Sequence, residues 1–141
     1  MNWQPKFSVA YSYPDFLTKY GQPTHLERWH AVWEKVRLTG AQRELLGSFT
    51  RQMNVLCLAG TWCGDCMNQC PIFEQFASAH PTIQLRFLDR DEHPDVQCEL
   101  SINGGHRVAI RTKLSGRCCR AWLTCLSVTG SSLASDRPSW T

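Results

Sequence analysis

The chain has 141 residues, 43% of them hydrophobic and 19% charged, with a formal net charge of +3 at pH 7. These values are ordinary for a soluble globular protein and allow one domain with a hydrophobic core. No apolar run is long enough to cross a bilayer, which excludes a membrane-spanning class. Residues 1–5 lack the basic and apolar regions of a signal peptide, so we expect a cytoplasmic protein with no membrane partner.

The positive charge lies mainly near the C-terminus. Residues 109–141 hold five of the fifteen basic residues and one of the twelve acidic residues. A basic tail can bind nucleic acid. No nucleic-acid-binding motif accompanies this one, however, so we expect no nucleic-acid partner.

The first fifty residues indicate helices. Residues 1–14 mix aromatic residues and prolines without a period, which predicts a mostly irregular arm. A short helix is expected at residues 15–20, and Gly21 is placed to end it.

Two capping-box patterns predict the helices that follow. Thr24 is followed three residues later by Glu27, and Trp29 and Trp33 then recur at helical spacing. This spacing places both tryptophans on one face, and we expect both to pack in the core. Residues 39–42 repeat the capping-box pattern before a second short helix.

A redox motif lies at a junction between a strand and a helix. Residues 53–58 are apolar except for Asn54, which predicts a buried central strand of a parallel sheet. Cys63 and Cys66 follow in the next loop, and a helical pattern continues over residues 67–79. Two cysteines separated by two residues in this setting are typical of redox catalysts.

The residues around this pair suit dithiol chemistry. Free backbone N–H groups at a helix N-terminus stabilise a thiolate, so we expect Cys63 to have a lowered pKa. Cys66 lies one helical turn later, within reach of a mixed disulfide on Cys63. Gly64 lets the loop turn closely. The carboxylate of Asp65 opposes thiolate formation and is expected to make the pair less oxidising.

The remainder of the core alternates strand and helix. Residues 83–88 predict a second strand, and Pro94 is well placed as the first residue of a short helix. Pro71 falls inside the helical pattern after the cysteine pair and is expected to kink that helix. Strand, helix, strand and helix in this order predict an α/β fold with a parallel strand pair.

These motifs resemble one known family. Residues 55–66, with Trp62 directly before Cys63, resemble the active-site strand and loop of the thioredoxin family. Pro71 lies where the family helix carries its kink proline, and residues 85–91 resemble the next strand and loop. The resemblance implies that Trp62 packs beside the cysteines on the substrate-facing surface.

The resemblance implies a thioredoxin-like three-layer sandwich over residues 51–108. Residues 1–50 would form an added helical segment packed on this core, and residues 109–141 an atypical, poorly structured basic tail. A thiol–disulfide oxidoreductase without a cofactor is implied, in which Cys63 attacks a disulfide and Cys66 resolves the mixed disulfide. Its expected role is cell redox homeostasis, with protein or small-molecule disulfides as substrates and a reductase or small thiol as electron donor.

Two positions depart from the family pattern. Cys57 stands where thioredoxins carry a buried acid that assists the resolving thiol, and we expect it to be an inert core residue. Ala109 stands in the slot of the family's cis-proline, and the residues after it show no clear pattern for the last two strands and the final helix. A shift of reading frame near Val108 would explain the missing proline and the tail together, because permitted codons then encode a proline and an apolar strand. The alternative is a divergent tail that is genuinely encoded.

Two other functions stay open. Cys63, Cys66, Cys70 and Pro71 form a C-x2-C-x3-C-P run, which overlaps an iron–sulfur pattern but lacks its upstream cysteine. A protein of this kind would bind a cluster or a metal through the three cysteines. The second alternative is a catalytically impaired product whose fold is incomplete after Val108.

Overall fold

The computed structural model describes residues 1–100, 110–114 and 117–118. The helices in these residues are α1 (Trp3–Val9), α2 (Tyr13–Tyr20), α3 (Pro23–Lys35), α4 (Gly40–Gly47), α5 (Gly64–Ala79) and α6 (Pro94–Glu99). The strands in the same residues are β1 (Met53–Ala59), β2 (Ile83–Asp89), β3 (Ile110–Leu114) and β4 (Arg117–Cys118). They form one sheet in the order β2-β1-β3-β4.

The parallel pair β1 and β2 organises the sheet. Its register runs from Met53 opposite Ile83 to Ala59 opposite Asp89. Parallel strands need a crossover connection, and α5 supplies it. The predicted α/β fold with a parallel pair is therefore confirmed. The carboxyl end of β1 leads directly into the loop that carries the cysteine pair.

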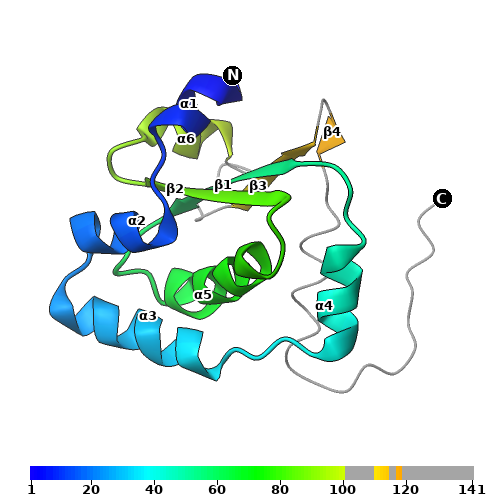
Figure 1. The fold of residues 1–141 in the computed structure, drawn as a ribbon. Coiled ribbons are helices and arrows are strands. Elements are labelled where there is room, and N and C mark those ends of the chain that lie inside the picture. Colours follow the sequence, from blue (N-terminus) through cyan, green and yellow to red (C-terminus); the bar gives the residue numbers. More distant parts are fainter. Residues whose placement is uncertain (101–109, 115–116, 119–141) are drawn as a thin grey trace.

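Helices cover both faces of the sheet, which makes the predicted three-layer sandwich (Figure 1). On one face α5 packs together with α2, α3 and α4, and the β1 side chains Val55 and Cys57 belong to this core. On the other face α1 and α6 cover Leu56 and Leu58. Strand β1 is buried on both faces, as its nearly continuous apolar sequence predicts.

The first residues are more helical than the sequence indicates. Residues 3–9 form α1 rather than an irregular arm, and the Asn2 side chain accepts a hydrogen bond from the N–H of Gln4 at its start. Trp3 and Phe7 pack against the core cluster that includes Leu56, Leu58 and Val96. Because α1 has only 7 residues, its apolar period is too short to be recognised without this tertiary contact.

The N-terminal segment also covers the outer edge of the sheet. Tyr11 pairs with Phe87 of β2 through two backbone hydrogen bonds of 2.8 and 2.7 Å. This bridge satisfies backbone groups of an edge strand that would otherwise be open to pairing. Further along, the capping box of Thr39 and Gln42 at the start of α4 is confirmed.

Helix α3 begins earlier than the Thr24 capping box predicts. Gln22 is its N-cap and Pro23 its first residue, a position where the missing N–H of proline leaves no bond unmade. Trp29 is fully buried, but Trp33 is 36% exposed, so the prediction that both pack in the core is wrong for Trp33. Four residues turn a helix by about 400°, which moves Trp33 about 40° toward the edge of the apolar face.

Two strands form where the sequence shows no clear strand pattern. β3 pairs antiparallel with β1, and β4 pairs antiparallel with β3. Such pairing uses backbone N–H and C=O groups and tolerates a sequence without regular alternation. Val108, Ala109 and the tail from residue 119 onward lie outside the described residues, and so do the expected final helix and the frame-shift point.

Candidate active site

The two cysteines of the motif lie at the start of α5, directly after β1. Cys63 is the N-cap of α5, and Cys66 lies in its first turn. Cys63 is partly exposed, whereas Cys66 is only 2% exposed and belongs to the core between the sheet and α5. The pair therefore offers one cysteine to a partner and keeps the other beneath it.

The N-terminal helices hold the loop that carries the pair. The indole N–H of the buried Trp29 donates a hydrogen bond of 2.8 Å to the carbonyl oxygen of Thr61. The Thr61 hydroxyl in turn donates to the carbonyl oxygen of Tyr20 over 3.1 Å. The sequence predicted Trp29 only as a core residue. Its indole N–H, which a buried tryptophan must satisfy, was the signal for this second role.

Trp62 forms the exposed side of the loop. Its side chain is 49% exposed, and its indole N–H donates to a carboxylate oxygen of Asp91 over 3.3 Å. The guanidinium of Arg90 lies 5.1 Å from the centre of the ring. A Cβ on Gly60 would come within 3.0 Å of the indole, so glycine at that position makes room for the ring. The sequence identified Trp62 but neither of its partners.

The end of β2 supports the residues around Trp62. Asp89 is buried, and its carboxylate accepts hydrogen bonds from the backbone N–H groups of Asp91 at 2.9 Å and Glu92 at 3.3 Å. The N–H of Arg90 donates to the carbonyl oxygen of Ala59 over 3.0 Å. These bonds tie the loop after β2 to the end of β1, where the cysteine loop begins.

The other predicted supporting residues have smaller roles. Gly64 and Asp65 are exposed in the first turn of α5, and Pro71 is buried inside this helix. A Cβ on Gly64 would meet no atom within 4 Å, so the fold does not require glycine there.

Cys66 is the more acidic thiol of the pair. A hydrogen bond donated by the Cys70 thiol is the main cause that lowers the Cys66 pKa to about 7, against the opposing effect of burial. Hydrogen bonds from the backbone N–H of Gly60 and from the Cys63 thiol lower it further, while the charge of Asp65 raises it. Asp65 thus opposes thiolate formation at Cys66, whereas the sequence-based expectation concerned the thiolate of Cys63.

The Cys63 thiol differs from expectation. Burial raises the pKa of Cys63, and so does the nearby charge of Cys66. The backbone N–H groups of Cys66 and Asp65 stabilise the Cys63 thiolate, as a helix N-terminus should, but they offset only part of this effect. The reduced pair therefore holds its negative charge mainly on Cys66, with the Cys63 thiol donating to it.

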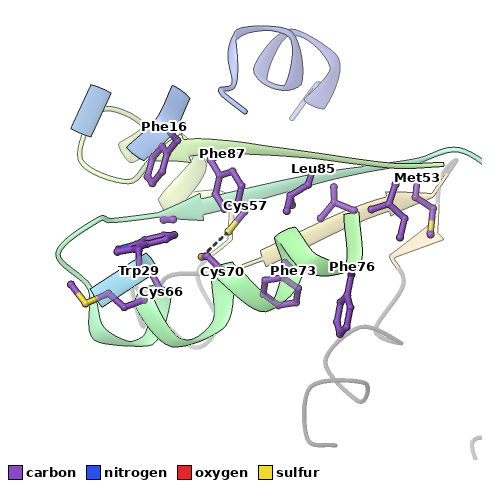
Figure 2. Packing of buried hydrophobic residues seen from close by; sticks show 14 of the residues in the cluster. Phe16, Trp29, Met53, Cys57, Cys66, Cys70, Phe73, Phe76, Leu85 and Phe87 are labelled. Carbon is purple, nitrogen blue, oxygen red and sulfur yellow. Dashed lines mark hydrogen bonds between the residues drawn. The ribbon is translucent and has the colours of Figure 1, made fainter. Parts of the chain in front are cut away.

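Two further thiols, one on β1 and one further along α5, face each other in the core (Figure 2). The sulfur atoms of Cys57 on β1 and Cys70 on α5 are 3.8 Å apart, and both side chains are buried. Burial raises the pKa of Cys70 well above its usual range, which keeps it a protonated donor toward Cys66. Cys57 was expected to be an inert core residue, and the structure adds that its sulfur contacts another thiol.

The three cysteines of the iron–sulfur alternative are not arranged as a ligand set. Within residues 1–100, 110–114 and 117–118, no group of three or more His, Cys, Asp or Glu side chains is placed to hold a metal ion. Cys70 contacts Cys57, which lies on the strand rather than in the C-x2-C-x3-C-P run. This geometry gives no support to a cluster at Cys63, Cys66 and Cys70.

Comparison with known families assigns the chain to one of them. A family model described as Thioredoxin matches residues 10–110, which is more than half of the sequence. The chain belongs to the thioredoxin family. Membership in this thioredoxin family supports a redox-type function in general. The match includes the N-terminal helices from α2 onward.

Two solved structures share the fold. A protein of unknown function from Pseudomonas aeruginosa superposes with a TM-score of 0.71 at 17% identity, covering 79% of this chain and 69% of its own. An HIV epitope scaffold gives a TM-score of 0.70 at 17% identity, covering 79% and 70%. Comparison with curated proteins produced no match. In the described part of this thioredoxin-family chain, no helix is long and apolar enough to span a bilayer.

Proposed function

We propose that the protein is a thiol–disulfide oxidoreductase that acts through Cys63 and Cys66. The observation that carries this proposal is the unequal exposure of the two cysteines within one dithiol at the start of α5. A disulfide substrate can approach Cys63, while Cys66 stays one turn below, in position to attack a mixed disulfide. Exchange between thiols and disulfides requires this combination of access and a neighbouring thiolate.

The electrostatics of the pair support a defined order of proton movements. The Cys63 thiol donates a hydrogen bond to Cys66, whose pKa of about 7 makes it a suitable acceptor for the Cys63 proton. The Cys63 thiolate then attacks one sulfur of the substrate, and the other substrate sulfur leaves as a thiolate. Cys66 next gives up a proton and attacks Cys63, which closes the Cys63–Cys66 disulfide and releases the second substrate thiol.

The partners follow from this chemistry. The substrates would be protein or small-molecule disulfides that dock beside the exposed ring of Trp62. A reductase or a small thiol would then return the Cys63–Cys66 disulfide to the dithiol. A reducing compartment such as the cytosol would keep the pair available for reduction of substrates, which fits a role in cell redox homeostasis.

Reduction of insulin disulfides in the presence of dithiothreitol tests the proposal. The wild-type chain should accelerate precipitation of the insulin chains, and Cys63→Ser should lower the rate to that of dithiothreitol alone. Cys98→Ser is the matched control, because Cys98 is an exposed cysteine on α6, away from the motif. Full activity in Cys63→Ser would reject the proposed nucleophile. A wild-type rate equal to the background would instead favour the catalytically impaired product.

A further inference from the structure

We propose that Cys57 and Cys70 form a second, buried dithiol that exchanges with the Cys63–Cys66 disulfide, so that one chain stores two pairs of electrons. This inference rests on the proposed redox role of Cys63 and Cys66. It assigns a chemical function to two thiols that substrate cannot reach.

The geometry brings Cys57, Cys66 and Cys70 into one buried core, next to the partly exposed Cys63. Cys66 and Cys70 are four residues apart on α5, so both lie on the helix face that packs on the sheet. Cys57 lies on β1 in the middle of the facing strand, with its sulfur 3.8 Å from that of Cys70 (Figure 2). A disulfide bond is about 2.05 Å long, so closing the Cys57–Cys70 bond requires the two sulfur atoms to approach from 3.8 Å to that distance.

The surroundings limit which oxidant can act on this inner pair. Cys57 is 0% exposed and Cys70 is 1% exposed. A protein disulfide therefore cannot contact either sulfur. Cys66 lies one helical turn before Cys70 on the buried face of α5, which connects the inner pair with the catalytic pair. The electron acceptor that we assign to the inner thiols is therefore the disulfide that Cys63 and Cys66 form during the proposed reaction.

The exchange is a pair of thiol–disulfide steps with no net gain or loss of electrons. In the first, Cys70 loses its proton and attacks the sulfur of Cys66, the Cys63–Cys66 bond breaks, and Cys63 leaves and takes up a proton. In the second, Cys57 loses its proton and attacks the sulfur of Cys70, and Cys66 leaves and is protonated. The inner pair is then oxidised to a disulfide, and the catalytic pair is again a dithiol.

The inner step should be slower than substrate reduction. Burial raises the Cys70 pKa well above its usual range, so only a small fraction is thiolate at neutral pH. Transfer to the inner pair therefore follows closure of the catalytic disulfide instead of competing with it. The chain would reduce one substrate disulfide quickly and a second one more slowly.

Disulfide mapping of the full wild-type chain tests the inference without disturbing the core. The fully reduced protein is freed of reductant and mixed with excess insulin. Samples taken over time are quenched in acid, denatured and alkylated with N-ethylmaleimide. Cyanogen bromide then cleaves after Met67 and chymotrypsin after Trp62, so Cys63 and Cys66 stay in one short fragment. Cys57 and Cys70 fall in the fragments before and after it.

The fragments distinguish the two disulfides directly. The inference predicts an early disulfide within the Cys63–Cys66 fragment, followed by a cross-linked pair of fragments that contain Cys57 and Cys70. Two insulin disulfides should then be reduced per chain. If Cys57 and Cys70 remain fully alkylated while the Cys63–Cys66 disulfide persists, the inner dithiol is rejected and the proposed function stands. If no Cys63–Cys66 disulfide forms at all, the proposed function is rejected, and the inner dithiol that depends on it is rejected as well.

Cys63→Ser is the matched control for the route of oxidation. This variant keeps the inner pair but cannot form the catalytic disulfide. It should show no Cys57–Cys70 cross-link with insulin as oxidant. An equal yield of the cross-link in Cys63→Ser would mean that the inner thiols are oxidised independently, which overturns the exchange.

Discussion

The loop that carries Cys63 lies between two groups of side chains that are built differently, here called the inner wall and the outer wall. The inner wall consists of buried side chains from α3, β1 and α5: Trp29, Cys57, Cys66 and Cys70. The outer wall consists of side chains around the end of β2 and the loop itself: Trp62, Arg90 and Asp91. Trp29 is fully buried, whereas Trp62 is 49% exposed, although both donate an indole hydrogen bond near the loop.

The inner wall positions the loop backbone, and the outer wall borders the surface through which a substrate would reach Cys63. On the inner wall, apolar burial and a hydrogen bond in a low-dielectric setting fix the loop backbone through Trp29. On the outer wall, an exposed cation–π contact is worth about 0.5–1 kcal/mol. In the proposed function, such weak contacts would let the surface beside Cys63 rearrange around a substrate. Substitutions on the inner wall should therefore change stability and thiol pKa values, and those on the outer wall should change substrate reactivity.

The largest expected difference is between the two tryptophans. Trp29→Ala should lower the free energy of unfolding by about 3–5 kcal/mol, because it leaves a cavity and removes the bond to Thr61. Trp62→Ala should change it by about 0.5–1 kcal/mol, since the ring is half exposed. Urea titration of both variants measures the comparison. Similar losses of stability in the two variants would remove the distinction between the walls.

Gly21 lies in the turn between α2 and α3, which places Tyr20 and α3 against the loop. Substitution of this glycine tests the packing of the turn. A Cβ there would lie 2.5 Å from the carbonyl oxygen of Leu17 and 2.5 Å from a methyl group of Leu26. Because the backbone oxygen cannot easily move, Gly21→Ala should cost about 1–3 kcal/mol of folding free energy. Gly47→Ala is the control, since a Cβ at Gly47 meets nothing within 4 Å. Thermal unfolding should show a clear loss only for Gly21→Ala.

Glu74 lies on α5, the helix that also carries Cys66 and Cys70, and tests partial burial on this helix through pH. Partial burial raises the Glu74 pKa to about 7, opposed by a hydrogen bond from Ser78. A folded-state pKa above the unfolded value gives a stabilising contribution that is complete below about pH 4.5 and is lost as the pH rises through about 7. Glu74→Gln should flatten this dependence. After allowance for solvent screening, the difference between acid and neutral pH should be on the order of 1 kcal/mol. An unchanged pH profile of urea unfolding would show that Glu74 is solvated.

The smallest effect expected is on the acidity of Cys66. Within a Cys63→Ser background, Cys70→Ala should raise the Cys66 pKa above its value in the background protein, because the main hydrogen bond to the thiolate is lost. The ultraviolet absorbance of the thiolate as a function of pH measures the shift. Cys98→Ala in the same background should leave the titration unchanged. A Cys66 pKa that is insensitive to Cys70→Ala would show that the inner thiols do not tune the pair.

Much of the fold could be predicted from local patterns. The apolar run of β1, the cysteine motif at the start of α5 and the parallel β2 follow from residue types and spacing alone. Helix α1 could not be found in this way, because it depends on packing of Trp3 and Phe7 against the far face of the sheet. β3 was missed for a similar reason, since its pairing with β1 depends on backbone groups rather than on a side-chain pattern.

The candidate site was predicted only in part. Cys63, Cys66 and Trp62 were identified from the motif, but the contact between Cys57 and Cys70 requires the register of α5 on β1. A strand repeats every two residues, which puts Cys57 on the same face as Val55, and a helix places Cys70 one turn after Cys66. Each pattern alone indicates simple packing, and only their combination brings the two sulfur atoms together. The Cys63 pKa likewise depends on the folded loop, because burial raises it and backbone hydrogen bonds lower it.

The most direct test of the central claim is to trap the first covalent step. In Cys66→Ser, the resolving thiol is absent, so a substrate disulfide should remain attached after Cys63 attacks it. Mass spectrometry of the intact variant after reaction with insulin should show the chain plus one insulin-derived adduct, located on the fragment that contains Cys63. Absence of the adduct, or its location on any other cysteine, would contradict a dithiol mechanism that begins at Cys63.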